Sequence, residues 1–168
     1  MANKQPVVPA FTLHGGPPLQ RSYPEAASQT FVKGEAVYLN GSGHVAEFTL
    51  GIDTGGQRFL GFAAADASND TVAATREVGV YLVQGTVFEM TVSSNGSDQV
   101  TALAQVGTVY PMYHDTTNGQ THVDIADTGG TLDSIRVFDV SDRANVGETN
   151  GRVLVTIELD IVQVAAGT

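Results

Sequence analysis

Short β-type runs punctuated by glycine are the feature that most constrains how this chain can fold. Three such runs follow one another: FVKGEAVYL at 31–39, FLGFAAA at 59–65 and GVYLVQGTVFEMTV at 79–92. Valine, tyrosine, phenylalanine and threonine favour strands, whereas a glycine within a run marks a bulge, a bend or a close backbone approach. The run at 58–65 is apolar on both faces, which is typical of a fully buried strand.

The run from Arg152 to Val164 alternates most cleanly of all. One face would carry Val153, Val155, Ile157, Leu159 and Ile161, and the other Thr156, Glu158 and Asp160. Such a period of two predicts a long strand with one face buried.

Two further runs, 106–113 and 120–125, flank the turn sequence Thr-Thr-Asn-Gly and predict a hairpin. Pro111 has no amide hydrogen, so we expect its run to lie at a sheet edge. About eight to ten strands emerge along the chain. We therefore predict an all-β fold, a compact β-barrel or β-sandwich with an extended N-terminal arm.

Composition supports this fold class and limits the partners. The chain has 168 residues, which suits one domain, with 19 glycines and 15% charged residues. Its net charge of −10 would repel nucleic-acid phosphates, so we expect no nucleic-acid partner. No run approaches the roughly 18 apolar residues of a membrane span, and the N-terminus has no apolar signal core, so we expect synthesis in a cytoplasm and no membrane partner.

Residues 1–28 differ from the body at 29–168. They hold all of the prolines except Pro111, and proline fits neither a helix interior nor a central strand. We predict an extended arm that is disordered in the free protein, so that the body folds without it. The arm also carries apolar residues with no evident local partner, and we predict that these bind another protein: Val7, Val8, Phe11, Leu13, Leu19 and Tyr23.

Asp-Thr-Gly occurs twice, at Asp53 and Asp127, and aspartic proteases use two such carboxylates to share one proton. Both copies continue to a second glycine, and Asp-Thr-Gly-Gly is also an ordinary turn sequence. The chain is, in addition, short for a two-lobed protease. We expect two turns that lie far apart and no catalytic residues.

The histidines and the clustered aspartates are the candidate metal ligands in this sequence. His114 and His122 lie in the predicted hairpin, but their spacing matches no standard ligand pattern, so we expect exposed histidines. The groups Asp66–Asp70 and Asp124–Asp133 lack the spacing of an EF-hand. The sequence therefore predicts no metal and no other cofactor.

The order of the runs resembles the decoration, or cement, proteins of tailed-phage capsids. The matching parts are the Lys-Gly-Glu-x-Val-Tyr strand at 33–38, Phe-Leu-Gly-Phe-Ala at 59–63 and Gly-x-Val-Phe-Glu at 85–89, and the resemblance covers roughly residues 29–160. It implies a structural protein, not an enzyme, that binds the outer surface of the mature capsid and stabilises contacts between capsomers of the major capsid protein. It also implies self-association, as a homotrimer or else a dimer.

Three alternatives stay open at this point. A different virion β-module, from a tail or head fibre, would be expected to show repeats. A carbohydrate-binding β-sandwich would present exposed aromatic side chains, and this chain has no tryptophan. An aspartic-protease-like enzyme would need Asp53 and Asp127 to meet.

Overall fold

The structure is a computed structural model that describes residues 5–48, 59–94, 97–115, 119–127, 133–141 and 146–158. The all-β prediction is confirmed, because these residues form strands joined by turns and one short 3₁₀ turn. The elements are β1 (Val8–Thr12), β2 (Gln20–Pro24), β3 (Ala36–Leu39), β4 (Val45–Glu47), β5 (Phe59–Ala63), β6 (Glu77–Leu82), β7 (Thr86–Ser94), β8 (Ser97–Asp98), η1 (Leu103–Gln105), β9 (Val109–Asp115), β10 (Gln120–Asp124), β11 (Asp133–Val140) and β12 (Arg152–Ile157). No helix in this part of the chain is long and apolar enough to span a bilayer.

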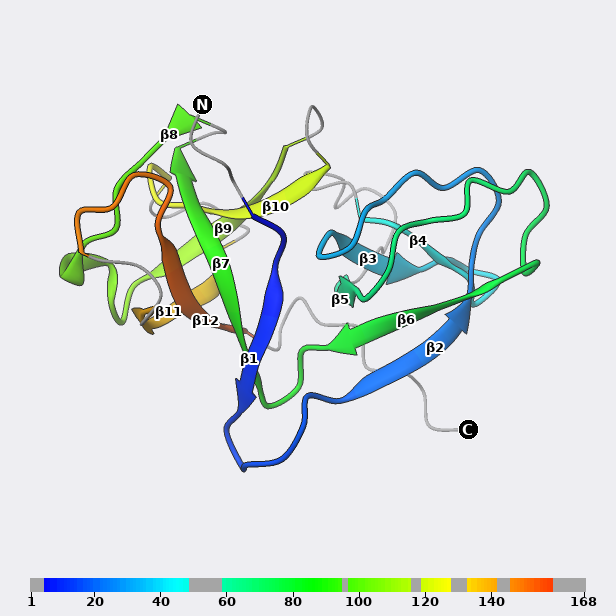
Figure 1. Cartoon of the computed structure of the whole chain (residues 1–168), viewed down its shortest axis with the longest axis horizontal. Helices are drawn as coiled ribbons and strands as arrows, with labels where there is room; N and C mark the ends of the chain where they lie inside the picture. The colour runs from blue at the N-terminus through cyan, green and yellow to red at the C-terminus, as the bar shows by residue number, and fades with distance from the viewer. Residues whose placement is uncertain are drawn as a thin grey trace.

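The first sheet closes into a small barrel. Its strands follow the order β7-β10-β9-β11-β12, and β12 pairs with β7 as well as with β11, which completes the ring. The neighbours are antiparallel except β7 and β10, which are parallel. Figure 1 shows this ring with β1 lying along β7. Of the two predicted architectures, the barrel is therefore the one that forms here.

The second sheet is antiparallel throughout, in the order β2-β6-β5-β3-β4. A single bridge between Glu25 and Val45 connects the end of β2 to β4. The prediction of a fully buried strand at β5 is confirmed, since all five of its residues are buried. Gly61 is required there, because a Cβ atom at this position would lie 2.1 Å from the carbonyl oxygen of Tyr81.

Aromatic rings connect the second sheet to the barrel. The ring of Phe59 lies 5.1 Å from that of Phe62, which in turn lies 4.8 Å from Phe88 of β7. All three side chains are fully buried in one core cluster that draws on both sheets. The two sheets therefore share a core, and the second sheet also has a smaller core of its own around Phe31 and Leu60.

Strand β12 has the predicted phase. Val153, Val155 and Ile157 are buried, whereas Thr156 and Glu158 are half-buried. Leu159, Asp160 and Ile161 lie outside the described residues.

The hairpin of β9 and β10 is also confirmed. The edge position predicted for Pro111 is wrong, because β9 lies between β10 and β11. Pro111 is accommodated at an irregularity of the β9–β11 register, next to its partner Asp133.

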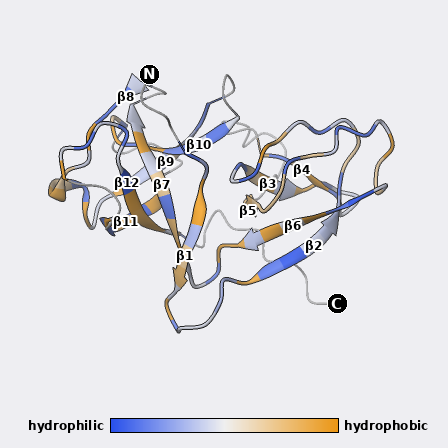
Figure 2. Ribbon diagram, viewed as in Figure 1, coloured by the Kyte–Doolittle hydropathy of each residue, from blue (hydrophilic) through white to orange (hydrophobic). Residues whose placement is uncertain are grey.

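The N-terminal segment is extended, as its prolines predicted, but from residue 5 onward it is not separate from the body. Strand β1 pairs with β7, β2 pairs with β6, and Val7 is 1% exposed in the shared core. Both strands lie at the ends of their sheets, and the β1 register shifts between Pro9 and Phe11, so the prolines take positions that a strand tolerates. Figure 2 shows β1 mostly in apolar colours and the start of β2 in hydrophilic ones. This pairing corrects the predicted boundary between an arm at 1–28 and a body at 29–168.

Candidate functional site

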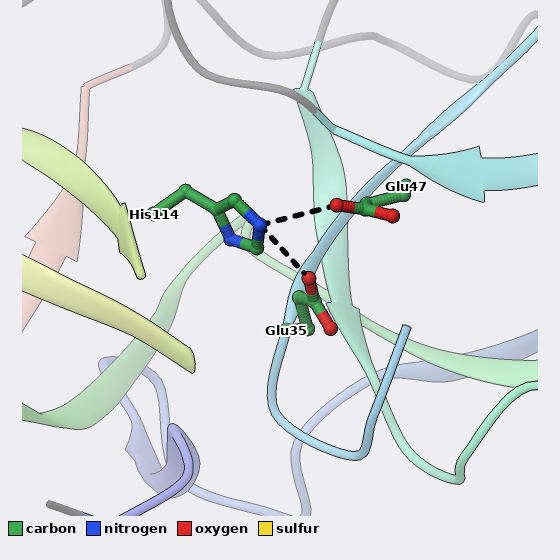
Figure 3. Close-up of side chains that lie close together, drawn as sticks. All are labelled: Glu35, Glu47 and His114. Atoms are coloured by element: carbon green, nitrogen blue, oxygen red, sulfur yellow. Dashed lines mark ion pairs between the residues drawn. The ribbon is translucent and has the colours of Figure 1, made fainter. Parts of the chain in front are cut away.

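Three strands from both sheets bring two carboxylates and an imidazole together. Glu35 immediately precedes β3, Glu47 ends β4, and His114 lies near the end of β9 in the barrel. Nε2 of His114 lies 3.2 Å from Oε1 of Glu35 and 3.1 Å from Oε1 of Glu47. Figure 3 shows the imidazole ring pointing between the two carboxylates. We call these three residues the Glu-Glu-His cluster.

The backbone around Glu35 fixes the direction of its side chain. Gly34 has a φ of +86°, which turns the chain just before β3. Within this turn the Val32 amide donates a hydrogen bond of 2.7 Å to Oε2 of Glu35, which leaves Oε1 directed at His114. A side chain at position 34 is excluded, because its Cβ would lie 2.7 Å from the amide nitrogen of Val7. The turn that presents Glu35 thus packs directly against the N-terminal segment at Val7.

A buried hydrogen bond beside the cluster ties the same two sheets. The amide of Ala36 in β3 donates to Oγ1 of Thr121 in β10, at 3.1 Å. Thr121 pairs across the hairpin with His114, so this bond fixes β9 and β10 against β3 at the level of the cluster. The cluster therefore sits at a rigid junction between the barrel and the second sheet.

The cluster gathers two acidic groups around one imidazole at a largely buried position. Glu35 is 2% exposed and His114 is 9% exposed, whereas the side chain of Glu47 is 30% exposed. Burial raises the pKa of Glu35, the Val32 hydrogen bond lowers it, and the charge of Glu47 raises it further, so that the pKa rises from 4.5 to about 7. Among the described residues, only His114 forms an ion pair with either glutamate. One imidazole thus faces two carboxylates that repel each other.

The sequence did not predict this cluster. We expected His114 and His122 to be exposed, but both are buried, His122 completely, with its ring stacked on Tyr113. They are buried because the hairpin forms a wall of the barrel and packs against the second sheet. The carboxylates that face His114 come from distant runs, so no local spacing could have indicated them. Glu35 did stand in the Lys-Gly-Glu run that carries the family resemblance.

The six residues predicted to bind a partner fall into three groups. Val7 belongs to the core; Val8 and Tyr23 are half-buried; Phe11, Leu13 and Leu19 are 40%, 52% and 45% exposed. The ring of Phe11 also lies 6.3 Å from that of Phe138, which is 50% exposed. We call these four exposed residues the apolar surface: Phe11, Leu13, Leu19 and Phe138.

The two leucines of the apolar surface are held by backbone bonds. The Leu13 amide donates to the carbonyl of Gly85 at 2.8 Å, and the carbonyl of Leu19 accepts from the Leu82 amide at 2.9 Å. Leu82 is the last residue of β6, and Gly85, with a φ of +66°, lies in the turn between β6 and β7. The backbone of the loop from residue 13 to 19 is thus anchored at both ends, next to its exposed leucine side chains.

The other candidates do not gather into sites. Asp53 lies outside the described residues, so its distance from Asp127 stays a prediction; Asp127 itself is exposed and directly follows the turn at the end of β10. Asp70 accepts hydrogen bonds from Thr75 and Ser68, which lower its pKa, and Asp66 accepts one from the Lys33 amide. Within the described part of the chain, the Glu-Glu-His cluster is the one group of three such side chains close enough to share a metal ion.

No protein-family model matches the sequence, and a search of curated proteins finds no significant match.

Proposed function

We propose that this protein is a structural virion protein that binds the outer surface of a mature tailed-phage capsid. It would stabilise contacts between capsomers of the major capsid protein. The runs that resemble decoration proteins support this proposal, since they form β3 with its preceding turn, β5 and the start of β7, the elements around which the two sheets pack.

The observation that carries the proposal is the apolar surface. Leu13 and Leu19 are about half exposed on a loop that is anchored at both ends, and Phe11 and Phe138 present two more apolar side chains. Large apolar residues at fixed, exposed positions are typical anchors of protein–protein interfaces. Because the loop is already ordered, binding would cost little additional conformational entropy.

Charge favours the outside of the shell. The chain carries a net charge of −10, which would be repelled by packaged DNA on the inner face. An outer position leaves the acidic surface in solvent while the apolar surface meets the capsid.

Self-association would add to binding at the shell. A trimer matches the three-fold and quasi-three-fold positions between capsomers, and three linked copies raise the effective concentration of each apolar surface at the lattice. Analytical ultracentrifugation of the free protein tests this part alone. A monomer that still binds heads would remove the trimer and leave the capsid role.

Co-sedimentation with phage heads tests the proposed function. The full chain is mixed with expanded, DNA-filled heads or with empty procapsids of a phage that encodes it, and bound protein is counted per capsid. We expect saturable binding to expanded heads at a fixed ratio to the major capsid protein, and weak binding to procapsids. Absence of saturable binding to expanded heads would overturn the proposal.

A further inference from the structure

We propose that the Glu-Glu-His cluster binds a divalent transition-metal ion, best Zn²⁺, which joins the barrel to the second sheet. Glu35 and Glu47 would each supply one carboxylate oxygen and His114 would supply Nε2. This inference does not depend on the capsid role.

The distances between the three ligand atoms suit such an ion. Zn²⁺ binds nitrogen and oxygen ligands at about 2.0–2.1 Å in tetrahedral geometry, which places neighbouring ligands about 3.3 Å apart. The two distances from Nε2 of His114 are 3.1 and 3.2 Å, and all three ligand atoms lie within 4.8 Å of one another. The two distances from His114 are thus within about 0.2 Å of the tetrahedral spacing, and a rotation of a glutamate side chain would set the third.

Charge balance gives a second and separate argument. Two carboxylates at a largely buried position are costly unless a proton or a cation neutralises them, and the raised pKa of Glu35 shows that its ionised form is disfavoured there. Two carboxylates with a neutral imidazole and a divalent ion sum to zero. Among the described residues no lysine or arginine pairs with Glu35 or Glu47 to supply that charge instead.

The surroundings supply orientation and access. The Val32 amide holds Oε2 of Glu35, so Oε1 is the free ligand atom of a fully buried side chain. The side chain of Glu47 is 30% exposed, which leaves an open side for entry of the ion and for a water molecule as fourth ligand. Nδ1 of His114 has no hydrogen-bond partner among the described residues, so we expect weaker binding than at zinc sites whose histidine is oriented by a second partner.

The mixture of ligands selects the metal. Imidazole with carboxylates suits Zn²⁺ and its neighbours, whereas Ca²⁺ takes six to eight oxygen ligands and Mg²⁺ requires octahedral oxygen coordination. Three ligands from both sheets also mean that binding would stabilise the junction and not only one hairpin. The folded state alone brings them together, so metal binding would raise the melting temperature.

Metal titration of the chelator-treated full chain tests the proposal. ZnCl₂ is added during isothermal titration calorimetry and thermal melting, and CoCl₂ is added for absorption spectroscopy. We expect one Zn²⁺ per chain, a melting temperature raised by several degrees, and the visible bands of tetrahedral Co²⁺. CaCl₂ and MgCl₂ should leave the melting temperature unchanged.

Matched variants locate the ion. Glu47→Gln changes a partly exposed ligand without a change in size, and we expect at least tenfold weaker Zn²⁺ binding and loss of the Co²⁺ bands. The controls Glu77→Gln and His14→Asn change an exposed glutamate and an exposed histidine outside the cluster and should bind like the wild type. Equal Zn²⁺ affinity of Glu47→Gln and the wild type, no Zn²⁺ binding by the wild type, or an equal response to Ca²⁺ would each overturn the proposal.

Discussion

The N-terminal segment divides at Thr12 into two parts with similar composition and different surroundings. Residues 5–12 complete the fold: Val7 is 1% exposed in the core and β1 pairs with β7, while Phe11 at the end of β1 is 40% exposed. Residues 13–19 form a surface loop whose two leucines are about half exposed. Both parts are rich in proline and apolar residues, so composition does not separate a segment that completes the fold from one that is available to a partner.

Arg152 explains much of this difference. Its guanidinium donates to the side chain of Gln5 at 3.2 Å, to the carbonyl of Pro6 at 3.1 Å and to the carbonyl of Glu89 at 2.7 Å. A buried cation on β12 thus holds the beginning of the segment against the barrel. The loop at 13–19 is held by backbone bonds at its ends and by the Thr12 hydroxyl, which donates to the Gly16 carbonyl at 3.1 Å, and its two leucine side chains are about half exposed.

Deletion of residues 1–28 gives the largest expected effect. From the sequence alone we expected the body to fold without them; the structure leads to the opposite expectation. The deletion removes β1 and β2, exposes the edges of β7 and β6, and takes Val7 out of the core. We expect a loss of more than about 5 kcal/mol, which is comparable to the whole stability of an ordinary domain. A cooperative thermal transition at the wild-type temperature would show that the segment is a separable arm after all.

Single substitutions in the two parts sharpen the comparison. Val7→Asp buries an unpaired carboxylate, so we expect a loss of several kcal/mol in the free energy of unfolding. The same change at Leu13, which is 52% exposed, should cost less than about 0.5 kcal/mol. Urea denaturation measures both. Similar losses in the free energy of unfolding at the two positions would contradict the division of the segment at Thr12.

Strand β12 provides the reference for a core strand. Ile157→Asp should cost several kcal/mol, as Val7→Asp does, because Ile157 is only 7% exposed. Glu158→Ala removes an exposed ion pair with Arg136 and should cost less than about 1 kcal/mol. If urea denaturation gave equal costs for these two changes, the phase of β12 would be wrong.

The pH dependence of stability should report the buried carboxylate of Glu35, which faces Glu47 and His114. Its pKa rises from 4.5 to about 7 in the folded state, so the folded protein holds this proton more tightly than the unfolded chain does. The proton on Glu35 therefore stabilises the folded state below about pH 4.5. This stabilisation, up to about 3 kcal/mol, is lost as the pH rises through 7. In the presence of EDTA, the free energy of unfolding of Glu35→Gln should decrease less between pH 5 and 8 than that of the wild type. An unchanged slope would contradict the raised pKa.

Sequence patterns predicted those parts of the fold that repeat locally. The alternation of β12, the doubly apolar run of β5 and the hairpin of β9 and β10 each carry their signal within one stretch. Two features were missed because they depend on distant segments. The pairing of β1 with β7 was not predicted because the segment contains prolines, which an edge strand tolerates. The Glu-Glu-His cluster was not predicted because its residues come from three separate runs.

We propose that the anchored loop at 13–19 binds the capsid, whereas residues 5–12 complete the fold. The most direct measurement is the affinity for expanded heads of Leu13→Ser/Leu19→Ser, compared with Val72→Ser/Leu103→Ser. The control pair removes two exposed apolar side chains elsewhere on the surface, a valine at 63% and a leucine at 66% exposure.

We predict that both double variants melt within a few degrees of the wild type. Burial of a leucine contributes about 1.5–3 kcal/mol, and half of that for each half-exposed side chain corresponds to a loss of tenfold or more in affinity at the loop. The control pair should bind heads like the wild type. Undiminished binding by Leu13→Ser/Leu19→Ser, in a protein that still melts normally, would contradict the account.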